Sequence, residues 1–318
     1  MSAPRVVVRK VFRRILLTTP VMLGGCCPAP SSGTYTVTSP MPEARDAGPV
    51  FSSVDAGALP RDGGSVACTS LCASAAAEVT NCAEVPSDAG PLLRCTYVVS
   101  DNFACGRRPE GLASLVGTDG DAFGRALAGM AYLEAASVPA FQRLAAELTV
   151  HGAPERLVRS ARRAVREETR HARMIGALAK QHGAHPPTPH HGPTHIRALD
   201  EVAGENAAEG CVRETYGALL AGWQAFHAQD HAFRAAMEII ALDEARHAQL
   251  AWDVAHWAEG RLDARARRRV RAAREAAVAE VLDAAAQPVE HGVAREAGLP
   301  SPAHASWLVT SLRQQMWS

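Results

Sequence analysis

The sequence predicts an all-α protein: a bundle of four helices with additional C-terminal helices, preceded by a small cysteine-rich module. Apolar residues make up 47% of the 318 residues and aromatic residues only 5%, because alanine supplies much of the apolar share. From residue 119 onward, apolar residues recur every three or four positions, which is the spacing of helices with one buried face. Runs of valine, isoleucine and aromatic residues at strand spacing are scarce, so we expect neither a β-sandwich nor a large α/β sheet.

The first 26 residues predict an export signal. Five basic residues precede a short apolar stretch, Ile15 to Gly25, which is too short to span a bilayer as a helix. It ends in Leu-Gly-Gly-Cys26, which resembles a bacterial lipobox. We therefore expect residues 1–26 to be a lipoprotein signal peptide, with Cys26 lipidated and the protein anchored to the cell envelope on the periplasmic side or at the outer membrane. Ordinary signal cleavage, with no role for Cys26, is the alternative.

Two further segments precede the helices. Residues 27–66 are rich in proline, serine, glycine and threonine and predict a disordered tether. Residues 67–110 predict a disulfide-stapled module, because an exported chain meets an oxidising compartment. The candidate cysteines are Cys68, Cys72, Cys82, Cys95 and Cys105. A zinc site is the alternative, although the spacing lacks a pair of C-x-x-C motifs. The sequence does not determine which cysteines pair.

The bundle is expected over residues 111–260, and further helices over 261–318. Periodic apolar stretches predict its four helices at about 119–149, 154–182, 197–227 and 231–259. The connection at residues 183–196 reaches about 46 Å when extended. It is therefore long enough to run along the bundle, although a simple up-and-down connection is also possible.

Acidic residues and histidines interrupt the apolar face of each helix near its middle. Two interruptions are Glu-x-x-His motifs, Glu168 to His171 and Glu244 to His247, and each follows a helix whose apolar face contains a glutamate. The i, i+3 spacing places a carboxylate and an imidazole on one helical face. An unpaired carboxylate in a core costs several kcal/mol, so such groups are usually paired or bind metal. The pattern predicts one shared site rather than four unrelated buried acids.

The order Glu, Glu-x-x-His, Glu, Glu-x-x-His over residues 119–259 resembles the ferritin-like di-iron carboxylate superfamily. The segments Asn206-Ala-Ala-Glu209 and Leu242 to His247 look like those of the ribonucleotide reductase small subunit, bacterioferritin and rubrerythrin. The resemblance implies two iron ions, with manganese as an alternative. The ligands that it implies are Glu134, Glu168, His171, Glu209, Glu244 and His247. It also implies that Glu167 and Asp243, each directly before a ligand glutamate, orient the histidines.

The ligand from the third helix has more than one candidate. Glu209 is our first choice and Glu214 the alternative; Glu205 lies on the same face one turn earlier. Glu214 is five residues after Glu209, about 140° around a regular helix. It would therefore leave the apolar face unless a π-helical bulge intervenes, as happens at functional sites.

The formal net charge of zero argues against a nucleic-acid partner. The resemblance implies an exported di-metal protein that reacts with O2 or peroxide as an oxidase or oxygenase, supplied by an outside electron donor. Whether it is an enzyme stays open. The alternatives are iron binding or sequestration without an organic substrate, and a structural lipoprotein with a degenerate bundle.

Overall fold

The computed structural model describes residues 8–18, 32–40, 78–85, 92–100, 107–109, 112, 119–190, 195–287 and 289–317. The described chain is mainly helical, as predicted. It divides into two units, one containing all the helices and one containing three strands. Cys26, Cys68, Cys72 and Cys105 lie outside the described residues, so neither lipidation nor their pairing is tested.

The three strands form an antiparallel sheet that no sequence pattern predicted. They are β1 (Ser32–Pro40), β2 (Glu78–Val85) and β3 (Leu92–Ser100), in the order β1-β3-β2. β1 lies in the segment expected to be a tether, and β2 and β3 lie in the expected cysteine-rich module. Stretches such as Thr-Tyr-Thr-Val-Thr in β1 have the β-branched and aromatic residues that strands favour. The register places Cys82 directly opposite Cys95.

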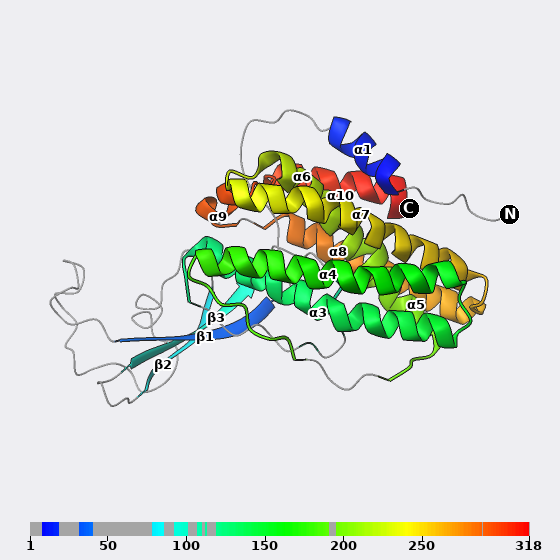
Figure 1. Cartoon of the computed structure of the whole chain (residues 1–318), viewed down its shortest axis with the longest axis horizontal. Coiled ribbons are helices and arrows are strands. Elements are labelled where there is room, and N and C mark those ends of the chain that lie inside the picture. Colours follow the sequence, from blue (N-terminus) through cyan, green and yellow to red (C-terminus); the bar gives the residue numbers. More distant parts are fainter. Residues whose placement is uncertain are drawn as a thin grey trace. The chain divides into compact units, whose positions relative to one another are not determined.

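Four long helical segments form the centre of the helical unit (Figure 1). They are α3 (Ala122–Val150), α4 (Glu155–Gln181), the continuous segment α5–η2–α6, and α7 (His231–Glu259). The third segment consists of α5 (Leu199–Glu205), the π-helix η2 (Asn206–Glu214) and α6 (Thr215–His227). All four begin and end within a few residues of the expected helices. Asp121 and Asp230 cap α3 and α7 by accepting hydrogen bonds from backbone N–H groups of their first turns, each at 2.6 Å.

The connection between α4 and α5 crosses from one end of the helical unit to the other. At its start, the carbonyl of His182 accepts a hydrogen bond from Asp121 N at the beginning of α3. At its end, the carbonyl of Arg197 contacts the His151 ring, just after α3, at 2.8 Å. Because α3 has 29 residues, or about 44 Å, the connection spans the whole helix. The third segment therefore runs in the same direction as α4.

Apolar residues pack into clusters at both ends of these helices. Phe123, Leu127 and Phe233 belong to the cluster near the start of α3, and Phe141 and Leu148 to the one near its end. Many buried positions in both clusters are alanines, whose small side chains let helices approach closely. The stretch between the two clusters is where the predicted acids and histidines lie.

The remaining helices pack around this centre. They are α8 (Ala264–Ala285), α9 (His291–Glu296), α10 (Pro302–Leu312) and the π-helix η3 (Arg313–Trp317). The N-terminal α1 (Val8–Thr18) also belongs to the helical unit, and it buries Val8, Phe12 and Ile15 in an apolar cluster shared with α6 and α10. Each helix in the described part of the chain is too short or too polar to cross a lipid bilayer.

Candidate metal centre

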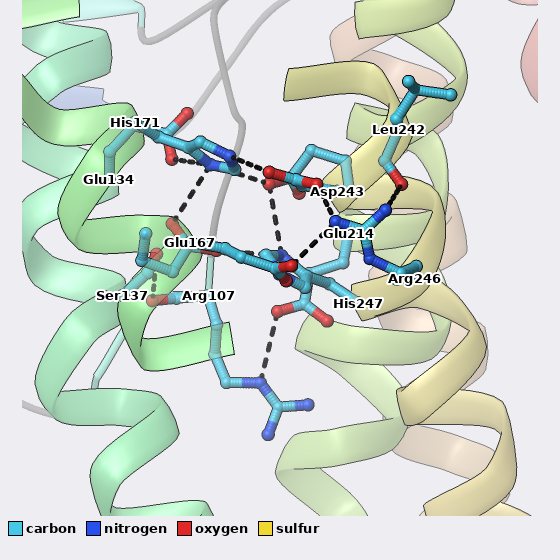
Figure 2. A network of polar contacts seen from close by, with 12 residues as sticks. Arg107, Glu134, Ser137, Glu167, His171, Glu214, Leu242, Asp243, Arg246 and His247 are labelled. Atoms are coloured by element: carbon cyan, nitrogen blue, oxygen red, sulfur yellow. Dashed lines mark hydrogen bonds and ion pairs between the residues drawn. The ribbon is translucent and has the colours of Figure 1, made fainter. Parts of the chain in front are cut away.

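Six ionisable side chains meet in the middle of the helical unit (Figure 2). None of them is more than 2% exposed. They come from four elements: Glu134 from α3, Glu168 and His171 from α4, Glu214 from η2, and Glu244 and His247 from α7. Within this cluster, ligand atoms of Glu134, Glu168, His171 and Glu244 all lie within 4.8 Å of one another, and this group could hold a metal ion.

Two of the glutamates lie between the two imidazole rings, whose centroids are 6.0 Å apart. One oxygen of Glu168 is 3.0 Å from Nδ1 of His247 and the other is 4.0 Å from Nδ1 of His171. Oε1 of Glu244 is 3.4 Å from Nδ1 of His171 and 3.2 Å from Nδ1 of His247. Glu134 adjoins His171, with 3.3 Å between its Oε2 and Nδ1. Glu168 and Glu244 therefore lie close to Nδ1 of both histidines.

The π-helix η2 decides which glutamate of the third segment enters the cluster. It covers Asn206–Glu214, and Glu214, its last residue, is buried whereas Glu209 is not among its buried residues. Glu214 is 1% exposed. Glu209 lies outside the cluster, where it pairs with Arg213 at 2.6 Å. Glu205 pairs with Arg143 at 2.7 Å instead. The structure thus differs from our first choice, Glu209, and brings in the alternative.

The two histidines are held from outside the cluster by acids of the opposite helix. Nε2 of His171 on α4 lies 3.1 Å from Oδ2 of Asp243 on α7, and Nε2 of His247 on α7 lies 2.9 Å from Oε2 of Glu167 on α4. These are the two acids expected to orient histidines. Because each acid engages Nε2, Nδ1 of each ring faces the glutamates.

Arginines hold these two outer acids. Glu167 accepts hydrogen bonds from Arg163 and Arg246, both at 2.7 Å, and Asp243 pairs with Arg170 and Arg246. Arg170 and Arg246 are the third residues of the two Glu-x-x-His motifs, so this signal was present in the sequence and was missed. Burial raises the pKa of Glu167, but hydrogen bonds from His247 and the arginines outweigh it and hold that pKa at about 2.

Arg107, from the segment before α3, is a functional candidate that the sequence did not reveal. Its side chain is 1% exposed, and its Nε lies 3.5 Å from Oε1 of Glu214. Burial raises the pKa of Glu214 to about 7, although the charge of Arg107 acts in the opposite direction. Arg107 lies in a stretch without periodicity, and only the tertiary fold brings it to the cluster.

The protonation of the metal-free cluster follows from its crowding. Burial lowers the pKa of His171, but the Glu134 and Glu244 carboxylates outweigh it and raise that pKa to about 10. The pKa of His247 is raised in the same way, chiefly by Glu244. Burial and the neighbouring carboxylates raise the pKa of Glu168, whereas the imidazoles outweigh burial at Glu244 and lower its pKa to about 2. Protons therefore occupy both imidazoles near neutral pH.

The donor atoms of the cluster are suited to metal binding. None of the eight carboxylate oxygens of Glu134, Glu168, Glu214 and Glu244 has a hydrogen-bond partner among the described residues, nor does Nδ1 of His171 or His247. Their close neighbours are one another, at the ion-pair distances given above, and a metal ion would be a natural common partner for them. Hard oxygen donors together with two imidazoles would suit iron or manganese.

Comparison with known proteins identifies no relative. A scan against protein-family models, a search of curated proteins and a search of solved structures each found no match for the chain. The arrangement of the cluster therefore carries the functional argument.

Proposed function

We propose that the chain is a ferritin-like four-helix bundle that holds two iron ions, or two manganese ions, and reacts with O2 or peroxide as an oxidase-type protein. The single observation that carries this proposal is the set of buried donor atoms without hydrogen bonds, directed at one another from four helical segments. The single long connection between α4 and α5 is also the topology of ferritin-like bundles.

Two ferrous ions, if bound here, would supply two electrons for the reduction of O2 or peroxide. Around it, Glu134, Glu168, Glu214 and Glu244 would supply the negative charge that holds the ions. Asp243 and Glu167 fix the two imidazole rings so that Nδ1 faces inward. Hydrogen bonds from Arg163 and Arg246 help to keep the pKa of Glu167 low, so this acid offers its charge to Nε2 of His247.

Burial limits what can reach the cluster. All six inner side chains are at most 2% exposed, which fits reactants as small as O2 or peroxide and disfavours a bulky substrate. The same observation supports the second candidate function, iron binding or sequestration without an organic substrate. For the oxidase function, an outside donor would have to return electrons to the ions after each turnover. Export with a lipid anchor at Cys26 remains part of the proposal.

Metal content tests the proposal directly. The purified chain, loaded with ferrous iron without oxygen and freed of excess metal, should carry about two ions per chain. Glu168→Ala and Glu244→Ala should each lose most of this metal, because both residues lie between the histidines. Glu238→Ala, at an exposed position of α7, is the control and should retain it. Absence of bound metal in the folded wild-type protein would refute the proposal.

Rapid mixing with oxygen separates the two candidate functions. The ferrous protein should consume O2 or peroxide, as followed by absorbance and an oxygen electrode. Repeated turnover in the presence of a chemical reductant supports the oxidase function. A single round of iron oxidation with retention of the ferric ions would instead support sequestration.

A further inference from the structure

The cluster is nearly symmetric, except for one arginine. Each Glu-x-x-His helix contributes a glutamate and a histidine, and each histidine is held by an acid of the other helix. Glu134 completes one half and Glu214 the other. The half of Glu214 also contains the guanidinium of Arg107, whereas among the described residues no arginine or lysine lies within ion-pair distance of Glu134. Nη1 of Arg107 also lies 3.8 Å from Glu205, outside the cluster, so the two halves differ in the charges next to Glu134 and Glu214.

Arg107 occupies a position that the fold is shaped to receive. Its Nη2 donates a 2.8 Å hydrogen bond to Oδ1 of Asn206, and its guanidinium lies 5.5 Å from the centroid of the Phe141 ring. Its carbonyl accepts a hydrogen bond of 3.1 Å from the Ser137 hydroxyl. A Cβ atom at Gly210 would lie 2.5 Å from Cβ of Ala251 and 2.5 Å from Nη2 of Arg107, so a glycine is favoured there. These contacts hold the Arg107 side chain in one position beside Glu214, so we treat it as part of the site.

We infer that Arg107 makes the two metal positions unequal. In the first, formed by Glu134, Glu168, His171 and Glu244, the ligand atoms already lie within 4.8 Å of one another. The second position is formed by Glu168, Glu214, Glu244 and His247. It receives an ion only when the Glu214 carboxylate is shared with Arg107 or released from it. The positive charge of Arg107 also opposes the incoming cation. The first ion therefore binds tightly and the second binds weakly and exchanges. This inference rests on the proposed metal centre.

Titration of the metal-free full chain with Co²⁺ under anaerobic conditions tests the inference, with binding followed by calorimetry and by the visible absorption of the bound ion. In the wild-type protein, the second ion should bind more weakly than the first by about tenfold or more, which is the scale of coupling between charged neighbours. Arg107→Gln should narrow this gap by strengthening the second step while leaving the first unchanged. Arg107→Lys, which keeps the charge, should retain the gap.

Two more variants assign the steps and guard against misfolding of Arg107→Gln. Glu214→Gln should leave one tight ion per chain, and Glu134→Gln should weaken the first step instead. Two wild-type ions of equal affinity would overturn the inference while supporting the metal centre, and absence of any binding would refute the metal centre itself. A gap that persists in folded Arg107→Gln, or loss of the tight ion rather than the weak one in Glu214→Gln, would also overturn it.

Discussion

Each of the helices α4 and α7 carries an acid that positions the histidine of the other helix. Asp243 of α7 contacts His171 of α4, and Glu167 of α4 contacts His247 of α7. Each acid directly precedes a glutamate that faces the cluster. Adjacent residues on a helix point about 100° apart, so one can face inward while the other reaches the neighbouring helix. Rotation of either helix would therefore disturb both halves of the site.

We expect Asp243→Asn and Glu167→Gln to weaken metal binding by about 10- to 100-fold, as loss of a group that orients a histidine ligand does elsewhere. The amides keep the shape of the side chain but lose its charge and offer a single acceptor oxygen. Competition with a chromophoric chelator measures the change, and Glu238→Gln on the exposed face of α7 serves as the control. Unchanged affinity in both variants would mean that these acids only stabilise the fold.

Metal binding should release protons and strengthen as the pH rises. The imidazoles of the metal-free cluster have raised pKa values, about 10 for His171, because carboxylates surround them. These protons stabilise the metal-free fold below the ordinary histidine pKa, and their contribution is lost as the pH rises through about 10. Ions must displace them, so the logarithm of the affinity should rise by about one to two per pH unit near neutrality.

Calorimetry in buffers of different ionisation enthalpy counts the released protons. A Co²⁺ or Mn²⁺ titration near neutral pH should show proton release that grows when both positions fill. The variant Glu238→Gln should behave like the wild-type protein. Metal binding without proton release and without dependence on pH would contradict the protonation that we assign to the cluster.

At the scale of single elements, the sequence predicted what depends on local periodicity. The helices around Glu168 and Glu244 were predictable because apolar residues recur along them and the i, i+3 spacing fixes one face. The choice between Glu209 and Glu214 was not, because it depends on the hydrogen-bond register of η2, and the same residues fit a regular helix. The contact of Arg107 with the cluster could not be predicted, because the position of its segment depends on tertiary contacts alone.

The strands were missed for a related reason. Each is short, with eight or nine residues, and gains its stability from pairing with segments distant in the sequence. The sequence around β2 and β3 is rich in cysteines, which indicate disulfides, but it lacks the clear alternation of polar and apolar residues that indicates strands. Pairing of strands is thus the information that a local reading of the chain lacks.

The register of β2 and β3 yields a prediction about the cysteines. Cys82 and Cys95 are direct partners in the register of the antiparallel pair. Cα atoms of such partners lie about 4.5 to 5.5 Å apart, which is within the range that a disulfide spans. We expect these two to form one when an oxidised dithiol such as a disulfide oxidoreductase or glutathione disulfide accepts their two electrons and protons. Non-reducing peptide mapping should recover the 82–95 pair, and Cys211, a buried free thiol, is the internal control. Consistent pairing of either with another cysteine would contradict the register.

At the scale of the whole molecule, α1 lies within the proposed signal peptide and also packs on the helical unit. Its apolar face contains Val8, Phe12 and Ile15, while Arg9 and Arg13 point outward, and Val8 N donates a hydrogen bond of 3.1 Å to the Gln249 side chain of α7. A basic amphipathic helix of this kind is compatible with an export signal that rests on the folded domain before cleavage. It contributes no residue to the metal cluster.

The chain that starts at residue 27 should therefore fold and bind metal like the full chain, but it should expose apolar side chains near Leu219 and Leu308, which share a cluster with α1. Far-UV circular dichroism and Co²⁺ titration should match between the two forms, and binding of a hydrophobic dye should rise in the shorter one.

In a bacterial host that processes lipoproteins, the full gene should yield a detergent-soluble product whose mass corresponds to a lipidated Cys26, and Cys26→Ser should abolish that product. A water-soluble product that still contains α1 would mean that α1 is a permanent part of the fold. Loss of metal binding on removal of residues 1–26 would mean the same, because the packing of α1 would then contribute stability that the cluster requires.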